Sequence, residues 1–246
     1  MHYYYPVDEV PATPDFVLRV MQDWTRQSIA AGETDCDFEL TGETTIAQFR
    51  YHLDLVPWEQ LARGYNKEFR IDCSLEEWST VLTPQNARTV DELCRFLAQR
   101  ISEPLIRPLE IAGVSCRAGG VFLTIRSLLV ADGADPDTIY PSAAVGPFLQ
   151  KHSQLFVGPI SRLAPGSMPT FVYTDDATFA ALFFCMCLFA IVNAFSGAGA
   201  IVVLTVLGLL QVLMIVLSWF VPQLFMTAMK LEQVTTFKDL SRRLAE

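Results

Sequence analysis

Residues 177–228, ATFAALFFCMCLFAIVNAFSGAGAIVVLTVLGLLQVLMIVLSWFVPQLFMTA, are the stretch that decides the fold. The stretch contains no charged residue, whereas a helix on the surface of a soluble protein needs a polar face. About twenty apolar residues suffice for a helix to cross a bilayer, and this stretch is long enough for two. The small residues at 196–199, SGAG, fit a tight turn between them. We therefore expect transmembrane helices at 177–195 and 200–221; the alternative is a buried hairpin inside a large soluble core.

The charged residues lie mostly before the apolar stretch. Residues 1–175 hold 14 of the 18 Lys and Arg residues and 23 of the 27 Asp and Glu residues, which gives them a net charge of −9. Residues 176–246 hold four of each kind and are neutral overall. The part before the stretch is therefore expected to face water. Its acidic surface repels phosphate backbones, so nucleic acid is not an expected partner.

The basic residues also predict the orientation in the membrane. The short turn between the two expected helices has no Lys or Arg, whereas Lys230, Lys238, Arg242 and Arg243 follow the second helix. Lys and Arg mark the cytoplasmic side of membrane segments. No basic region followed by an apolar run opens the sequence, so no signal peptide is expected. We expect a multi-pass protein of the cell (inner) membrane with both termini in the cytoplasm.

The remaining sequence is typical of a mainly α protein. Thr13-Pro14-Asp15 has the form of a helix start, and Ser74 and Thr89 each open a capping box, S/T-x-x-E. Amphipathic segments follow these signals with short joins, which favours an antiparallel helical core. The expected organisation is an N-terminal arm and helix (1–35), an acidic cytosolic helical domain (36–170), the transmembrane hairpin (177–228) and a juxtamembrane amphipathic tail (229–246). Residues 1–170 are expected to fold alone.

Less regular segments give more limited expectations. Short strands are expected at 38–40 and 171–174, and residues 105–115 form an extended connection that holds one strand at most. A helix is expected at 121–130, after Gly119-Gly120, and a last soluble helix at 142–163, broken at Gly158-Pro159. Residues 164–170, APGSMPT, have the composition of a linker. We detect no convincing internal repeat.

The C-terminal tail predicts a short basic amphipathic helix. Thr236 opens another capping box, and Phe237, Leu240 and Leu244 share one side of the helix that follows. The remaining positions include three cations, namely Lys238, Arg242 and Arg243. Such a helix can lie on anionic lipid headgroups. The alternative is a frayed polar tail.

Few residues offer catalytic chemistry. The sequence has no HExxH, CxxC or G-x-S-x-G motif and no phosphate-binding loop, so neither a metal site nor a cofactor is expected. Cys94 lies on an apolar stripe, where we expect an inert thiol of raised pKa. Cys116, next to Arg117, is the better candidate for a reactive thiol, although an ordinary loop thiol is the favoured interpretation. The scattered cysteines before the apolar stretch suit a reducing compartment.

Residues 128–169 resemble in outline the latter part of an acyl carrier protein. They contain an Asp-Pro loop, then Ile139-Tyr140-Pro141, then Ser153 fourteen residues after Ile139, and a helix that closes near Met168-Pro169. In that family the serine follows an Asp and bears a phosphopantetheine arm. Here His152 precedes Ser153, so the Asp is missing. The resemblance implies a similar helical shape without the prosthetic arm.

Polar residues inside the apolar stretch predict contact between membrane helices. Asn193 lies near the turn and can bond to loop carbonyls, whereas Gln211 lies in mid-span. A buried amide in lipid seeks a partner, and Gly208 allows a second backbone to come near. We expect Gln211 to contact either the first helix of its own hairpin or a second copy of the chain.

Three functions remain open. The first is a membrane-anchored cytosolic interaction or scaffold module without its own catalysis, which has the lipid bilayer and a protein as partners. The second is an oligomeric membrane effector or channel-like subunit, whose soluble domain senses a signal and whose hairpins assemble. The third is a thiol enzyme or degenerate carrier that uses Cys116 or Ser153. The absence of a recognisable catalytic set favours the first.

Overall fold

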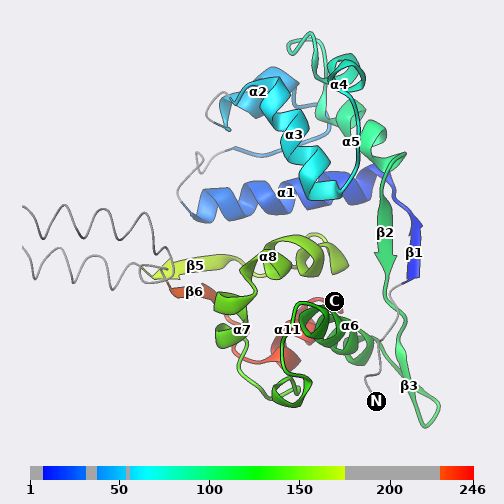
Figure 1. The fold of residues 1–246 in the computed structure, drawn as a ribbon, viewed down its shortest axis with the longest axis vertical. Coiled ribbons are helices and arrows are strands. Elements are labelled where there is room, and N and C mark those ends of the chain that lie inside the picture. Colours follow the sequence, from blue (N-terminus) through cyan, green and yellow to red (C-terminus); the bar gives the residue numbers. More distant parts are fainter. Residues whose placement is uncertain (1–7, 32–37, 54–55, 175–227) are drawn as a thin grey trace, which may run out of the picture. The chain divides into compact units, whose positions relative to one another are not determined.

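The structure is a computed structural model that describes residues 8–31, 38–53, 56–174 and 228–246. The described chain is mainly helical, as expected (Figure 1). The chain divides into two compact units: residues 1–171 with 231–246 form unit 1, and residues 172–230 form unit 2. No helix among the described residues is long and apolar enough to cross a membrane. The predicted transmembrane stretch, 177–228, lies outside the described residues except for Ala228.

The first half of unit 1 is built from short helices. They are α1 (Pro14–Ala30), α2 (Ile46–Tyr51), α3 (Trp58–Phe69), α4 (Leu75–Leu82) and α5 (Val90–Ala98). α1 packs against α5, and both helices belong to unit 1. The short strand expected at 38–40 does not form, and these residues have no regular structure.

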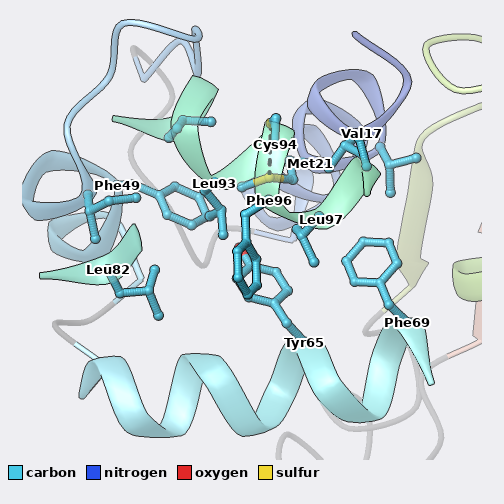
Figure 2. Packing of buried hydrophobic residues seen from close by; sticks show 14 of the residues in the cluster. Val17, Met21, Phe49, Tyr65, Phe69, Leu82, Leu93, Cys94, Phe96 and Leu97 are labelled. Atoms are coloured by element: carbon cyan, nitrogen blue, oxygen red, sulfur yellow. Dashed lines mark hydrogen bonds between the residues drawn. The ribbon is translucent and has the colours of Figure 1, made fainter. Parts of the chain in front are cut away.

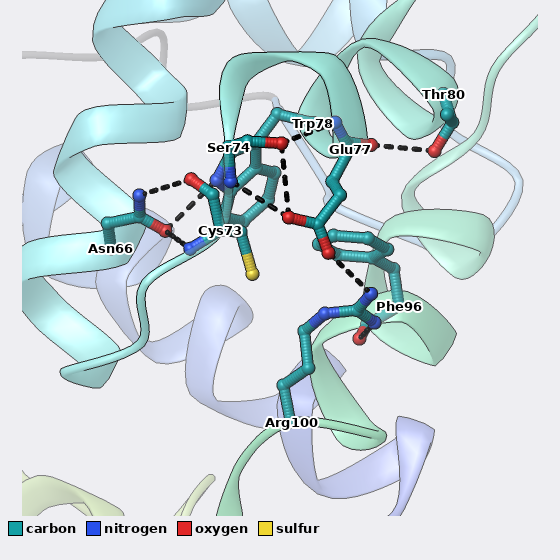
Figure 3. Close-up of polar contacts among 8 residues, drawn as sticks. All are labelled: Asn66, Cys73, Ser74, Glu77, Trp78, Thr80, Phe96 and Arg100. Atoms are coloured by element: carbon teal, nitrogen blue, oxygen red, sulfur yellow. Dashed lines mark hydrogen bonds and ion pairs between the residues drawn. The ribbon is translucent and has the colours of Figure 1, made fainter.

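Side-chain caps fix where these helices begin. Thr13 accepts a hydrogen bond from Phe16 N (3.1 Å), which confirms the predicted start of α1. Both predicted capping boxes also form. At α4, Ser74 Oγ accepts from Glu77 N (3.2 Å) while Ser74 N donates to the Glu77 carboxylate (2.9 Å) (Figure 3). Each box satisfies amides at a helix start that have no partner within the helix.

The core of this half is apolar and rich in aromatic side chains. Cys94 of α5 lies 3.9 Å from the sulfur of Met21 of α1, and Tyr65 of α3 lies close by (Figure 2). Trp78 of α4 is fully buried, and its indole N–H donates to the side-chain oxygen of Asn66 (3.0 Å) (Figure 3). A buried indole needs such an acceptor, because an unpaired donor in the core costs free energy.

Short strands connect the two halves of unit 1. β1 (Asp8–Pro11) pairs antiparallel with β2 (Ser102–Leu105), and β3 (Leu109–Ile111) pairs with β4 (Val114–Cys116). The connection expected at 105–115 with one strand at most therefore holds a small hairpin. Ala112 and Gly113 form its turn with positive φ values of 50° and 80°.

The second half of unit 1 begins with a long helix. Its described elements are α6 (Arg117–Ala131), η1 (Pro136–Thr138), α7 (Gly146–Lys151), α8 (Ser153–Leu155), η2 (Phe156–Ile160), η3 (Ser161–Leu163) and α11 (Phe237–Arg243). The helix expected at 121–130 starts earlier and includes Gly120, where a Cβ would lie 2.1 Å from the Arg107 carbonyl oxygen. Glycine here lets two backbone segments approach each other.

The helix expected at 142–163 is interrupted at a different place. The break falls at His152, between α7 and α8, and the chain stays helical through Gly158 and Pro159. Residues 156–160 form a π-helical turn. This wider turn accommodates the ring of Pro159, which would clash with the preceding turn of an α-helix.

The C-terminal tail belongs to unit 1. The predicted helix forms with its capping box at Thr236, but its apolar side packs on α6 in the protein. Phe237, Leu240 and Leu244 are each 0% exposed. The tail is neither frayed nor free to insert these side chains into lipid, because the protein core already covers them.

Candidate functional site: the stem of the apolar segment

The described residues on the two sides of the apolar segment form a pair of strands. β5 (Phe171–Thr174), which was predicted, leads into the segment, and β6 (Ala228–Leu231) leads out of it; the two strands pair. Just outside the pair, Glu232 N donates to Thr170 O (2.9 Å). We call residues 164–174 and 228–232 the stem. The chain thus leaves unit 1 and returns to it at one place.

Three polar side chains of α1 hold the first strand of the stem. Asp23, Arg26 and Gln27, here called the α1 clamp, lie in the last two turns of that helix. All three bind backbone groups of residues 166–171. The hydrogen bonds run from Gly166 N to Asp23 Oδ2 (2.8 Å), from Arg26 Nη2 to Met168 O (2.9 Å), from Gln27 Nε2 to Pro169 O (3.1 Å) and from Phe171 N to Gln27 Oε1 (2.8 Å).

The clamp gives fixed partners to a segment with the composition of a linker. Gly166 has φ +93°, a conformation that L side chains rarely adopt, and this turn directs its N–H to Asp23. Met168 and Phe171 are buried at 3% and 2% exposure, so apolar packing adds to the polar contacts. Residues 164–170 are therefore part of the folded unit and not a free tether.

Asp23 is the buried charge of the clamp. Its residue is 3% exposed, and burial raises the pKa of its carboxyl group above the ordinary value. The hydrogen bond from Gly166 and the charge of Arg26, whose Nη2 lies 2.7 Å from Asp23 Oδ1, act in the opposite direction. A carboxylate removed from water needs such partners, because an unpaired buried charge is costly.

A second contact joins the two halves of unit 1 near the stem. Arg162 of η3 forms an ion pair with Glu68 of α3 and donates to the Glu68 backbone oxygen (2.9 Å). Its guanidinium also lies 4.9 Å from the ring centre of Phe69. Burial lowers the pKa of Arg162, and the charge of Glu68 opposes that shift. α3 is thereby tied to the helical segment that runs into the stem.

Of the residues predicted to act at the membrane, the structure describes those of the C-terminal tail but not those of the apolar segment. Asn193, Gly208 and Gln211 lie outside the described residues, so their predicted role in helix association stays a prediction. Lys238 and Arg242 are exposed on α11, as is Arg243, which pairs with Glu246 at 3.2 Å. Their predicted contact with lipid headgroups also stays a prediction. Only the apolar side of that helix is shown to have another partner.

The residues considered for catalysis have structural contacts. Cys116 is the N-cap of α6, where its Sγ accepts from Gly119 N (3.3 Å). Ser153 opens α8. The neighbouring His152 is buried and directs Nδ1 to Asp132 (2.6 Å). Cys94 is buried, and burial raises the pKa of its thiol to about 12, the direction expected for a thiol on an apolar stripe.

Within the described residues, no group of three or more His, Cys, Asp and Glu side chains is placed to hold a metal ion. No known family, curated protein or solved structure matches this chain. The function must therefore be argued from the geometry of the stem and from the sequence that it brackets.

The sequence did contain a signal for the α1 clamp. Asp23 lies between Met21 and Trp24, within the run of residues that forms the buried side of α1. A carboxylate at such a position needs a buried partner. The identity of that partner, a backbone amide more than a hundred residues later, could not be inferred from the pattern.

Proposed function

We propose that the protein is a membrane-anchored interaction or scaffold module without its own catalysis. A transmembrane hairpin within residues 177–228 is the anchor, and unit 1 is the water-facing module. The observation that carries the proposal is the pairing of β5 with β6, which flank residues 175–227, a stretch whose only charged residues are Asp175 and Asp176. A two-helix hairpin must leave and re-enter the water-facing domain at neighbouring points, as this stem does.

The packing of the tail supports a hairpin with both ends on one side. α6 precedes the apolar segment and α11 follows it, yet the two helices share one core. Residues on the two sides of the segment must then lie in the same compartment. An even number of crossings satisfies this requirement. The Lys and Arg residues that follow the segment favour the cytoplasm as that compartment. The membrane that holds the hairpin is then the cell (inner) membrane.

The surface of unit 1 favours a protein partner over nucleic acid. The chain carries a net charge of −9, and all of it falls on residues 1–175. Such a surface attracts basic partners and steers their approach. The partner proposed is therefore a protein with a basic surface, which the module holds at the membrane.

Cysteine labelling in intact cells tests the anchor. Ala198→Cys introduces a thiol in the turn between the expected helices, and Ala245→Cys introduces one in the tail. A membrane-impermeant reagent should label the first variant and spare the second until the cells are opened. The chain without new cysteines serves as the control for the native thiols. Labelling of the Ala245→Cys variant in intact cells, or protection of the Ala198→Cys variant, would refute the hairpin.

The α1 clamp supports a second candidate, an oligomeric membrane effector. It ties a helix in the first half of unit 1 to the strand that enters the apolar segment. A change at α1 would then alter the contacts of residues 166–171, which lead into β5. Assembly would use Gln211 and Gly208, with Asn193 nearer the turn, and each interhelical hydrogen bond contributes roughly 1–2 kcal/mol in model peptides.

Light scattering in detergent separates the two candidates. An oligomer that shrinks in the Gln211→Leu variant favours the effector, because this exchange removes the amide and keeps the apolar length. Gln223→Leu, a second amide-to-leucine exchange near the end of the stretch, is the matched control. A monomeric wild-type chain favours the anchored module.

A further inference from the structure

A network of backbone contacts fixes the start of α5. The residues before α2 form a β-bridge with the N-cap of α5, and hydrogen bonds cross between the two segments. The contacts are the bridge Thr45–Thr89 and the hydrogen bonds from Ile46 N to Arg88 O (2.9 Å), from Val90 N to Thr44 O (2.9 Å) and from Asp91 N to Gly42 O (2.9 Å). This junction ties the second and last helices of the first half together.

The same network recurs at the start of α11. Here the residues before α7 bridge to the N-cap of the C-terminal helix. The contacts are the bridge Ala144–Thr236 and the hydrogen bonds from Val145 N to Thr235 O (3.0 Å), from Phe237 N to Ala143 O (3.2 Å) and from Lys238 N to Pro141 O (2.7 Å). Each hydrogen bond at the start of α5 has a counterpart at the start of α11 with the donor and the acceptor on the corresponding segments.

The correspondence holds with constant offsets in the sequence. Residues before the second helix are shifted by 99 positions, as from Thr45 to Ala144. Residues of the last helix are shifted by 147 positions, as from Thr89 to Thr236. Three hydrogen bonds at each helix start, two of which make up the bridge, agree on both offsets, which is not expected from two unrelated helix starts.

The last helices also match in sequence. Residues 89–98 read TVDELCRFLA and residues 236–245 read TFKDLSRRLA, with identical Thr, Leu, Arg, Leu and Ala at five of ten positions. Both start with a capping box. The positions that face the core correspond too. The buried pairs are Val90 with Phe237, Leu93 with Leu240, Cys94 with Ser241 and Leu97 with Leu244.

The first helices play equivalent parts. α1 packs on α5, and α6 packs on α11. α1 buries Val17, Val20 and Met21, and α6 buries the same i, i+3, i+4 positions, namely Val121, Thr124 and Ile125. Figure 1 shows α6 in green beside α11 in red, although 105 residues separate the end of α6 at Ala131 from the start of α11 at Phe237.

We infer that unit 1 consists of two copies of one helical unit and that the apolar segment is an insertion into the second copy. The first copy spans 14–98 and the second 117–244. Between its second and last helices, the first copy has α3 and α4; between α7 and α11, the second copy has α8, η2, η3, the stem and the apolar segment. The repeat is argued from residues of unit 1 alone, and the inference does not depend on the membrane proposal.

The insertion has a mechanical consequence. The last helix of the second copy reaches α6 only after the chain has passed through the whole apolar segment. Separation of the two strands of the stem would pull α11 from α6, whereas the first copy holds its own last helix through continuous sequence. The second copy is therefore the one whose last helix depends on the stem.

Matched substitutions in the full-length chain in detergent test the inference. Leu93→Ala and Leu240→Ala remove the same side chain from the two copies. Hydrogen–deuterium exchange of α1 and α6 is the readout, because exchange reports local opening. We expect Leu93→Ala to speed exchange in α1 by at least about tenfold and Leu240→Ala to do the same in α6, each with little change in the other helix.

Two results would overturn the inference. One is that Leu240→Ala opens α1 as much as α6; the other is that it leaves α6 unchanged. If either alanine variant fails to fold, the milder pair Leu97→Val and Leu244→Val gives the same reciprocal comparison. Loss of the hairpin topology in the labelling experiment would leave this result unaffected, so the two proposals fail separately.

Discussion

Removal of the C-terminal tail should unfold the second half of unit 1, even though the tail follows the apolar segment. Phe237, Leu240 and Leu244 of α11 are fully buried. Full burial of such a side chain stabilises by about 1.5–3 kcal/mol, so the three together contribute roughly 5–9 kcal/mol. A whole domain is stable by only about 5–15 kcal/mol. The fragment 1–170, which the sequence predicts to fold alone, therefore lacks a necessary helix.

A chain that keeps the tail and omits the apolar segment should fold. Glu232 N lies 2.9 Å from Thr170 O, so a linker of about four Gly and Ser residues can join residue 171 to residue 231. We expect this joined chain to be soluble and helical by far-UV circular dichroism and to unfold cooperatively. The fragment 1–170 should lose the protection of α6 from proteolysis. Equal thermal stability and equal protection of α6 in the two chains would refute this reasoning.

Further predictions concern single side chains of the joined chain. Burial raises the folded pKa of Asp23 above its ordinary value of 3.8. The contribution of Asp23 to the free energy of unfolding is therefore fully present below pH 3.8 and is lost as pH rises through the raised pKa. The unfolding free energy of the wild type minus that of Asp23→Asn should fall as pH rises through this window in urea titrations; a rise would contradict the assignment. Ser74→Ala should cost about 1 kcal/mol through loss of the α4 cap, with Ser79→Ala as the within-helix control; equal costs would argue against the cap. In the native state Cys116 should react with iodoacetamide at neutral pH well before Cys94, whose pKa of about 12 keeps it protonated; the reverse order in a mass-spectrometric time course would be inconsistent with the burial of Cys94.

Local signals predicted the helices but not their partners. A capping box depends on residues three apart, so Ser74 and Thr89 could be recognised from the sequence, and both caps form. The break at His152 in place of Gly158-Pro159 shows the limit of such rules, because a π-helical turn accommodates Pro159. The α1 clamp depends on pairs of residues more than a hundred positions apart, which no local pattern contains.

The tail shows why an apolar stripe alone cannot identify what it binds. Phe237, Leu240 and Leu244 would cover a lipid surface or a protein helix equally well, since the hydrophobic effect is not directional. The deciding information is the match between 236–245 and 89–98, which identifies the tail as the closing helix of a repeated unit. That match covers only ten residues. In addition, the apolar segment lies just before one of the two matching stretches and changes the spacing along the chain, so the repeat is difficult to recognise from the sequence. The hydrogen bonds from Val90 to Thr44 and from Phe237 to Ala143 reveal the repeat, because the backbone contacts of the two copies correspond even where their side chains differ. The apolar segment is then best understood as a part of the second copy, whose closing helix packs on α6 only after the chain has passed through that segment.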